Sequence, residues 1–137
     1  MTLNSFQFNT TPGLRFGSGQ AKDACKEISN KLGEHILFVT DKGLMSLGLT
    51  EITLQELKKL GNIEIFDEVE ADPSKKTLLK AIEIGKKIKA TGVVGFGGGS
   101  SMDVAKLAAL ILGSNENLEE AWGVANAKGP RLPLVLI

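Results

Sequence analysis

Short apolar runs alternate with longer amphipathic segments along the chain. Three runs, residues 35–40, 93–96 and 134–137, are too apolar to alternate, which is typical of strands buried on both faces of a parallel sheet. Residues 63–66 predict one further strand. Between the runs, apolar residues recur at helical spacing. The helical segments are expected over residues 20–32, 42–47, 52–60, 74–89 and 100–112.

Glycine, proline and small polar residues mark where these elements end. Gly33 follows the first helical pattern in the position of a C-terminal glycine cap, and Ser18 or Gly19 can begin that helix. Residues 6–10 and 14–16, on either side of a Pro-Gly turn, predict a short hairpin. Residues 117–122 predict one helical turn, followed by a loop over residues 123–129.

Alternating strands and helices with short connections predict an α/β fold. The expected architecture is a Rossmann-like open parallel sheet with right-handed crossovers and helices on both faces, preceded by the short hairpin. In such sheets, ligands bind outside the carboxyl ends of the strands, where the strand order reverses. Asp41, Asp72 and the glycines after residue 96 all follow predicted strands. We therefore expect them to meet at one edge of the sheet.

Length and charge restrict the possible functions. With 137 residues, of which 42% are hydrophobic, the chain has the size of one domain with its own core. Lys plus Arg equals Asp plus Glu at 16 each, so the overall charge favours neither nucleic acid nor an anionic membrane as partner. The lysines of one helical segment are expected to form a solvated face: Lys75, Lys76, Lys86, Lys87 and Lys89.

The expected compartment is the cytoplasm. No apolar run approaches the roughly 20 residues that span a bilayer, and the first residues lack the pattern of a signal peptide. The single cysteine, Cys25, cannot form an internal disulfide, which fits a reducing compartment. Its position on the apolar stripe of a helix predicts a small buried hydrophobic residue and not a nucleophile.

Three consecutive glycines, Gly97, Gly98 and Gly99, separate the apolar run 93–96 from a helical segment. Glycines let another molecule approach the backbone, and the unpaired N–H groups at a helix start attract a phosphate. The segment therefore predicts a nucleotide-phosphate cradle, with a plain tight turn as the alternative. Two better-known loops are excluded, because a Walker A lysine is missing and Ser100 stands where the dinucleotide fingerprint needs its third glycine.

The same stretch resembles the Gly-Gly-Gly-Ser-x-x-Asp-x-x-Lys signature of the iron-containing (group III) alcohol dehydrogenases, a family related to glycerol dehydrogenase and dehydroquinate synthase. Ser100, Asp103 and Lys106 follow the three glycines in this register, and residues 16–19, 39–43, 66–69 and 72–73 continue the resemblance. It implies a dehydroquinate synthase-like N-terminal domain that binds NAD(P). It also implies that residues 1–137 form this domain without the helical C-terminal domain that holds a divalent metal, iron or zinc.

The resemblance assigns roles to individual residues. Asp41 would accept hydrogen bonds from an adenosine ribose and repel a 2′-phosphate, which favours NAD over NADP; the alternative is a helix cap. Asp103 would meet a ribose or nicotinamide group, or only cap its helix, and Lys106 would pair with it. Asp72 stands where many members have asparagine, so it either contacts the ligand or caps the helix over residues 74–89.

The chemistry of the family needs residues that this sequence does not contain. Its metal is held by an aspartate and histidines downstream, whereas the sole histidine here, His35, begins a predicted strand. A catalytic metal needs at least three convergent ligands, so neither a metal site nor a catalytic residue is expected in this chain.

The expected function is therefore the NAD-binding part of a metal-dependent alcohol dehydrogenase, inactive alone. Its partners would be the nicotinamide dinucleotide and the missing C-terminal domain, and uncovered core surface could promote self-association. The alternatives are a non-catalytic nucleotide-binding module, a truncated gene product without function, and a parent enzyme such as glycerol dehydrogenase or maleylacetate reductase.

Overall fold

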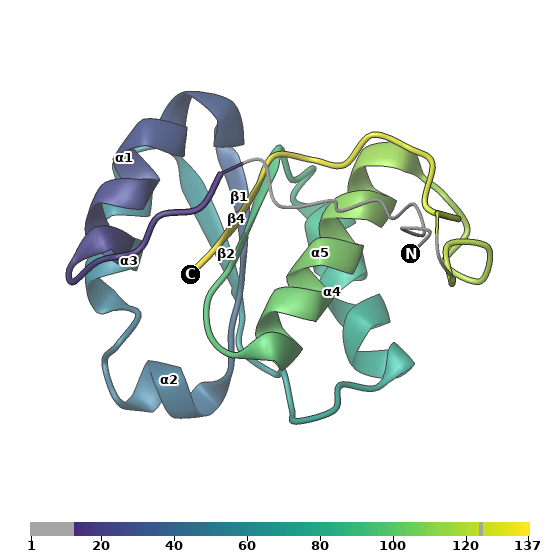
Figure 1. Cartoon of the computed structure of the whole chain (residues 1–137), viewed down its shortest axis with the longest axis horizontal. Coiled ribbons are helices and arrows are strands. Elements are labelled where there is room, and N and C mark those ends of the chain that lie inside the picture. The colour runs from purple at the N-terminus through teal and green to yellow at the C-terminus, as the bar shows by residue number, and fades with distance from the viewer. Residues whose placement is uncertain (1–12, 124) are drawn as a thin grey trace, which may run out of the picture.

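The computed structural model describes residues 13–123 and 125–137, and residues 24–29 by their backbone alone. The predicted strand over residues 6–10 and the burial of the Cys25 side chain lie outside this description. Residues 14–16, predicted as the other strand of the hairpin, are described and form no strand, so this part of the prediction was wrong. Figure 1 shows the helices and strands in their spatial arrangement. In chain order the elements are α1 Gln20–Leu32, β1 His35–Val39, α2 Lys42–Ser46, α3 Glu51–Lys58, β2 Asn62–Phe66, α4 Lys75–Lys87, β3 Gly92–Gly95, α5 Gly99–Ser114 and β4 Leu134–Leu136.

Within the described residues, the strands form one parallel sheet in the order β2-β1-β3-β4. The chain passes from β1 outward to β2, returns across β1 to β3, and continues outward to β4 on the other side. The strand order therefore reverses between β1 and β3. This arrangement confirms the predicted open parallel α/β sheet.

Helices cover both faces of the sheet, as predicted. In Figure 1, α1 and α3 lie on the left of the strands and α4 and α5 on the right. Alternate residues of β1 supply the two cores: Ile36 and Phe38 belong to the cluster on the α1 and α3 side, and Leu37 and Val39 to the cluster on the α4 and α5 side. Because both faces are covered, the central strands are apolar throughout.

The ends of the elements mostly follow the sequence signals. Gly33 ends α1 with φ 74°, as predicted for a C-terminal glycine. The cap of α4 is Ser74, whose hydroxyl accepts from the Thr77 N–H, so the alternative that Asp72 caps this helix was wrong. The predicted helical turn over residues 117–122 is a hydrogen-bonded turn without a helix, in which the Ala121 N–H donates to the Asn117 carbonyl over 3.2 Å.

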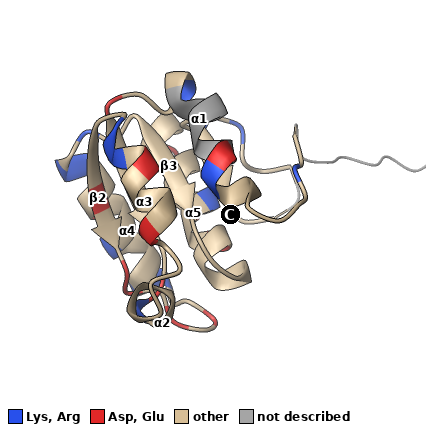
Figure 2. Ribbon diagram, turned by 90° about the vertical axis from the view of Figure 1, so that its left-hand side faces the viewer, with Lys and Arg blue, Asp and Glu red and all other residues tan. Residues whose placement is uncertain are grey.

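Charged residues of both signs are interspersed over the ribbon in Figure 2, which matches the equal numbers of acidic and basic residues. The lysines predicted to form a solvated face on α4 and just beyond it are exposed. In the part of the chain that the structure describes, no helix is long and apolar enough to cross a membrane.

Candidate functional site

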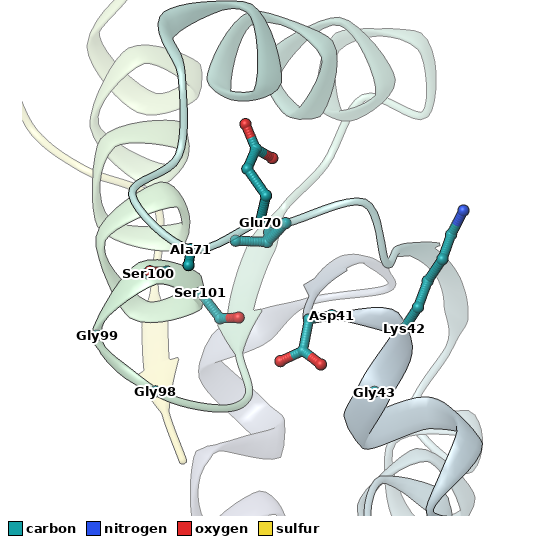
Figure 3. A pocket seen from close by; sticks show the side chains of 10 residues that line it. Asp41, Lys42, Gly43, Glu70, Ala71, Gly98, Gly99, Ser100 and Ser101 are labelled. Carbon is teal, nitrogen blue, oxygen red and sulfur yellow. The ribbon is translucent and has the colours of Figure 1, made fainter.

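A hollow of about 420 Å³ opens at the carboxyl edge of the sheet. It is formed by three chain segments that follow β1, β2 and β3 respectively. Its lining residues are Asp41, Lys42, Gly43, Val69, Glu70, Ala71, Gly98, Gly99, Ser100 and Ser101. Figure 3 shows these segments facing one another across the hollow. The sequence therefore correctly placed Asp41 and the glycine loop at one edge of the sheet.

The hollow lies where the strand order reverses. The segments after β1 and β3 run to opposite sides of the sheet, because β1 leads to β2 and β3 leads to β4. Two connections that diverge from neighbouring parallel strands leave a crevice between them, which is the usual ligand position in open α/β sheets.

The start of α5 differs from the starts of the other two helices beside the hollow. The Leu44 N–H of α2 donates to Asp41 Oδ1 over 2.9 Å, and the Thr77 N–H of α4 donates to Ser74 Oγ over 3.2 Å. At α5, the N-cap is Gly98, which has no side chain to accept such a bond. The first helical bond runs from the Met102 N–H to the Gly98 carbonyl, so the amides of residues 99–101 precede it.

The backbone conformation requires glycine at only one of the three consecutive glycine positions. Gly97 has φ 136°, which L side chains rarely adopt, and a Cβ there would lie 2.8 Å from Leu44 Cδ1. Gly98 has an ordinary φ of −75°, Gly99 is helical, and a Cβ on either would meet no atom within 4 Å. The fold alone therefore explains Gly97 but leaves open space beside Gly98 and Gly99. Such space suits a ligand that approaches the backbone.

Asp41 has the capping role that the sequence offered as an alternative. Its Oδ1 accepts the Leu44 N–H, and its residue is half-buried. In Figure 3 the carboxylate points into the hollow, toward the segment that carries Gly98 and Ser101. Because one oxygen caps α2 and a carboxylate has four acceptor positions, capping leaves capacity for a hydroxyl donor. The proposed contact with a ribose stays a prediction.

Asp103 and Asp72 are not among the residues that line the hollow. The Lys106 Nζ donates to Asp103 Oδ1 over 2.9 Å, which confirms the predicted pair. Asp72 is exposed and has φ 51°, in the left-handed region that aspartate tolerates better than most residues. A ligand contact by either side chain stays a prediction.

Six lining residues were not predicted as site residues: Lys42, Gly43, Val69, Glu70, Ala71 and Ser101. Two of them, Ser101 and Glu70, bear on the geometry of the site. Ser101, 2% exposed, was treated only as part of the helix, but it directs its hydroxyl toward the hollow in Figure 3. Glu70 was not considered, although its Oε1 accepts from the Ser74 N–H over 3.0 Å and from the Thr77 hydroxyl over 2.5 Å. The available signal was an acidic residue just before a Ser-x-x-Thr helix start, where a carboxylate is favoured.

These hydrogen bonds lower the pKa of Glu70 from 4.5 to about 2, with the Thr77 hydroxyl as the main cause and the Ser74 N–H next. A lowered pKa in the folded state means that the carboxylate stabilises the fold fully above pH 4.5 and loses this contribution as the pH falls toward 2. We expect the Glu70→Gln variant to lose less unfolding free energy than the wild type between pH 6 and pH 2, measured by urea titration. Parallel losses in the two proteins would contradict this assignment.

His35 lies at the start of β1, where its N–H donates to Thr91 Oγ1 over 3.0 Å. This confirms its predicted position at a strand start, far from the hollow along β1. Among the side chains of residues 13–23, 30–123 and 125–137, no three histidine, cysteine, aspartate or glutamate residues lie close enough together to hold a metal ion.

Comparison with known proteins agrees with this geometry. The family model "Iron-containing alcohol dehydrogenase" matches residues 11–137. Sulfoacetaldehyde reductase of Bilophila wadsworthia is 30% identical over 97% of this chain and 35% of its own length. The chain thus spans about a third of that relative.

Solved structures show the same fold. Alcohol dehydrogenase from Oenococcus oeni superimposes with a TM-score of 0.86 at 24% identity, over 96% of this chain and 35% of that one. Sulfoacetaldehyde reductase from Bifidobacterium kashiwanohense, in complex with NAD+, gives a TM-score of 0.73 at 26% identity, over 97% of this chain and 36% of that one. The family model, which covers nearly all of the sequence, shows that the chain belongs to the iron-containing alcohol dehydrogenase family.

Proposed function

We propose that this chain is the NAD-binding part of a metal-dependent alcohol dehydrogenase. The observation that carries the proposal is the open space beside Gly98 and Gly99, next to helix amides that no side chain caps. The chain itself has no need of glycine at these two positions. A ligand with negative charge, such as a pyrophosphate, would use both the space and the amides.

The residues that would hold the cofactor lie on two sides of the hollow. The amides at the start of α5 would bind the pyrophosphate, and Asp41 would accept from the hydroxyls of the adenosine ribose. When bound, the nicotinamide supplies hydride transfer to or from a substrate carbon. We assign the metal and the alcohol site to the part of the relatives beyond the matched third. The NAD-bound relative supports this choice of cofactor.

Titration calorimetry with NAD+ and NADP+ tests the proposal. The wild-type chain should bind NAD+ more tightly than NADP+, because the Asp41 carboxylate repels a 2′-phosphate. The absence of measurable NAD+ binding would contradict the proposed function.

The Asp41→Asn variant tests the assigned role of the carboxylate. Asparagine caps helices as well as aspartate does, so the fold should be unchanged. Loss of the charge should reduce the preference for NAD+ over NADP+ by about tenfold, as expected for a hydrogen bond to a charged group. An unchanged ratio of the two dissociation constants would show that Asp41 only caps α2.

A further inference from the structure

The connection between β2 and α4, residues 67–73, forms one wall of the hollow. We call it the connector. Its residues Val69, Glu70 and Ala71 line the hollow opposite the segment that carries Gly98 and Gly99. In Figure 3, the Glu70 side chain points away from Asp41. The position of this wall therefore decides how much room a ligand finds between the connector and the start of α5.

The connector is attached to the fold at several points. At its beginning, the Val69 N–H donates to the Thr40 carbonyl over 3.3 Å, and the Val69 side chain is buried in the core. In its middle, Glu70 Oε1 accepts from the N–H of Ser74, the N-cap of α4, and from the hydroxyl of Thr77 in the first turn of that helix. Between Glu70 and Ser74 the backbone turns through Asp72 with a positive φ. Aspartate adopts this conformation more readily than most residues.

The structure assigns Glu70 as a positioning residue for the cofactor: by binding the amino end of α4, its carboxylate fixes the connector wall opposite the α5 amides. This assignment rests on the proposed NAD-binding function. The Glu70 carboxylate, with its bonds to Ser74 and Thr77, is called the anchor below. It occupies the positive amino end of α4 with a negative group of the chain itself. Of the starts of α4 and α5, only the start of α5 therefore remains for a ligand phosphate.

Variants at both ends of the anchor test this role. Glu70→Ala removes the acceptor of both bonds and releases the connector wall. It should weaken NAD+ binding by about tenfold, the loss expected if the wall is correctly placed for only about a tenth of the time. Thr77→Val keeps the side-chain shape but removes one donor, and it should weaken binding less. Glu70→Gln keeps an oxygen that can accept both bonds, and it should restore affinity to within about twofold of wild type. Because glutamine is neutral, restored affinity would show that Glu70 acts by holding the connector in place and not through its negative charge.

Glu68→Gln is the matched control. Glu68 lies in the same connector, is exposed, and accepts from Lys80 Nζ of α4 over 2.7 Å, but it does not line the hollow. It should leave the NAD+ affinity unchanged. All dissociation constants are measured by calorimetry at a temperature where circular dichroism shows each variant to be folded.

The outcomes separate the two proposals. If the wild type binds NAD+ and Glu70→Ala and Thr77→Val bind it equally well, the positioning role is overturned while the proposed function stands. A loss of affinity in Glu70→Gln as large as in Glu70→Ala would also overturn it. If Glu70→Ala does not fold, Thr77→Val and Glu70→Gln still decide the question. A wild type that does not bind NAD+ would overturn the proposed function and this assignment with it.

Discussion

Replacing Gly99 by alanine is expected to weaken NAD+ binding by about tenfold to a hundredfold, the range that corresponds to losing hydrogen bonds to a charged group. The added methyl group would occupy the open space beside the α5 amides, where the ligand should approach. The same variant should fold as well as the wild type or be more stable by up to about 1 kcal/mol, because alanine restricts the unfolded chain. Calorimetric titration and urea unfolding measure the two effects.

The opposite directions of these two effects make the experiment specific. Gly13 is a matched control, since a Cβ there also meets no atom within 4 Å, and the residue is not among those that line the hollow. Gly13→Ala should leave NAD+ binding unchanged. If Gly99→Ala also left binding unchanged, the loop would be only a tight connection between β3 and α5.

Replacing Gly95 by alanine is expected to destabilise the fold by about 1–3 kcal/mol, the usual cost of overpacking a core. Gly95 ends β3 where α5 crosses the sheet, and an added Cβ would lie 2.6 Å from the Ala105 Cβ and 2.9 Å from Leu136 Cδ2. Relief of this clash would move the helix whose amides face the hollow. Urea unfolding should therefore show the lower stability, and calorimetry a weaker NAD+ affinity.

A second substitution tests the cause of this effect. Ala105→Gly removes the nearest clashing atom, although glycine inside a helix itself costs about 1 kcal/mol. The double variant should therefore be more stable than the sum of the two single effects, since the residues are in direct contact. Simple additivity, or a Gly95→Ala variant as stable as wild type, would contradict the close packing of α5 on β3.

The order of strands and helices could be predicted because each element carries its own signal. The apolar run around Ile36–Val39 predicted a buried strand, and Gly33 marked the end of α1. The ends of β3 were predicted less accurately: the sequence predicted residues 93–96, whereas the strand is Gly92–Gly95. Its register with β1, in which Ile36 pairs with Gly92 and Val39 with Gly95, depends on a neighbour that is distant in sequence.

The site could be predicted where its residues follow strands, and not where it depends on contacts across the fold. Asp41 and the glycine loop were placed correctly, because the carboxyl ends of parallel strands meet at one edge. Glu70 and Ser101 were missed, since one is directed by its bonds to α4 and the other is a serine of ordinary appearance in a helix. No local pattern shows which serine of a helix faces a hollow.

The most direct test of the NAD-binding proposal is an NMR titration of the wild-type chain with NAD+, following each backbone amide. The account predicts that the largest shift changes occur at residues 98–101, with further changes near Asp41. A second hollow lies at the opposite edge of the sheet, beside His35 and Asn62, and provides the contrasting outcome. Shift changes confined to that edge, or no change at residues 98–101 with saturating NAD+, would contradict the account.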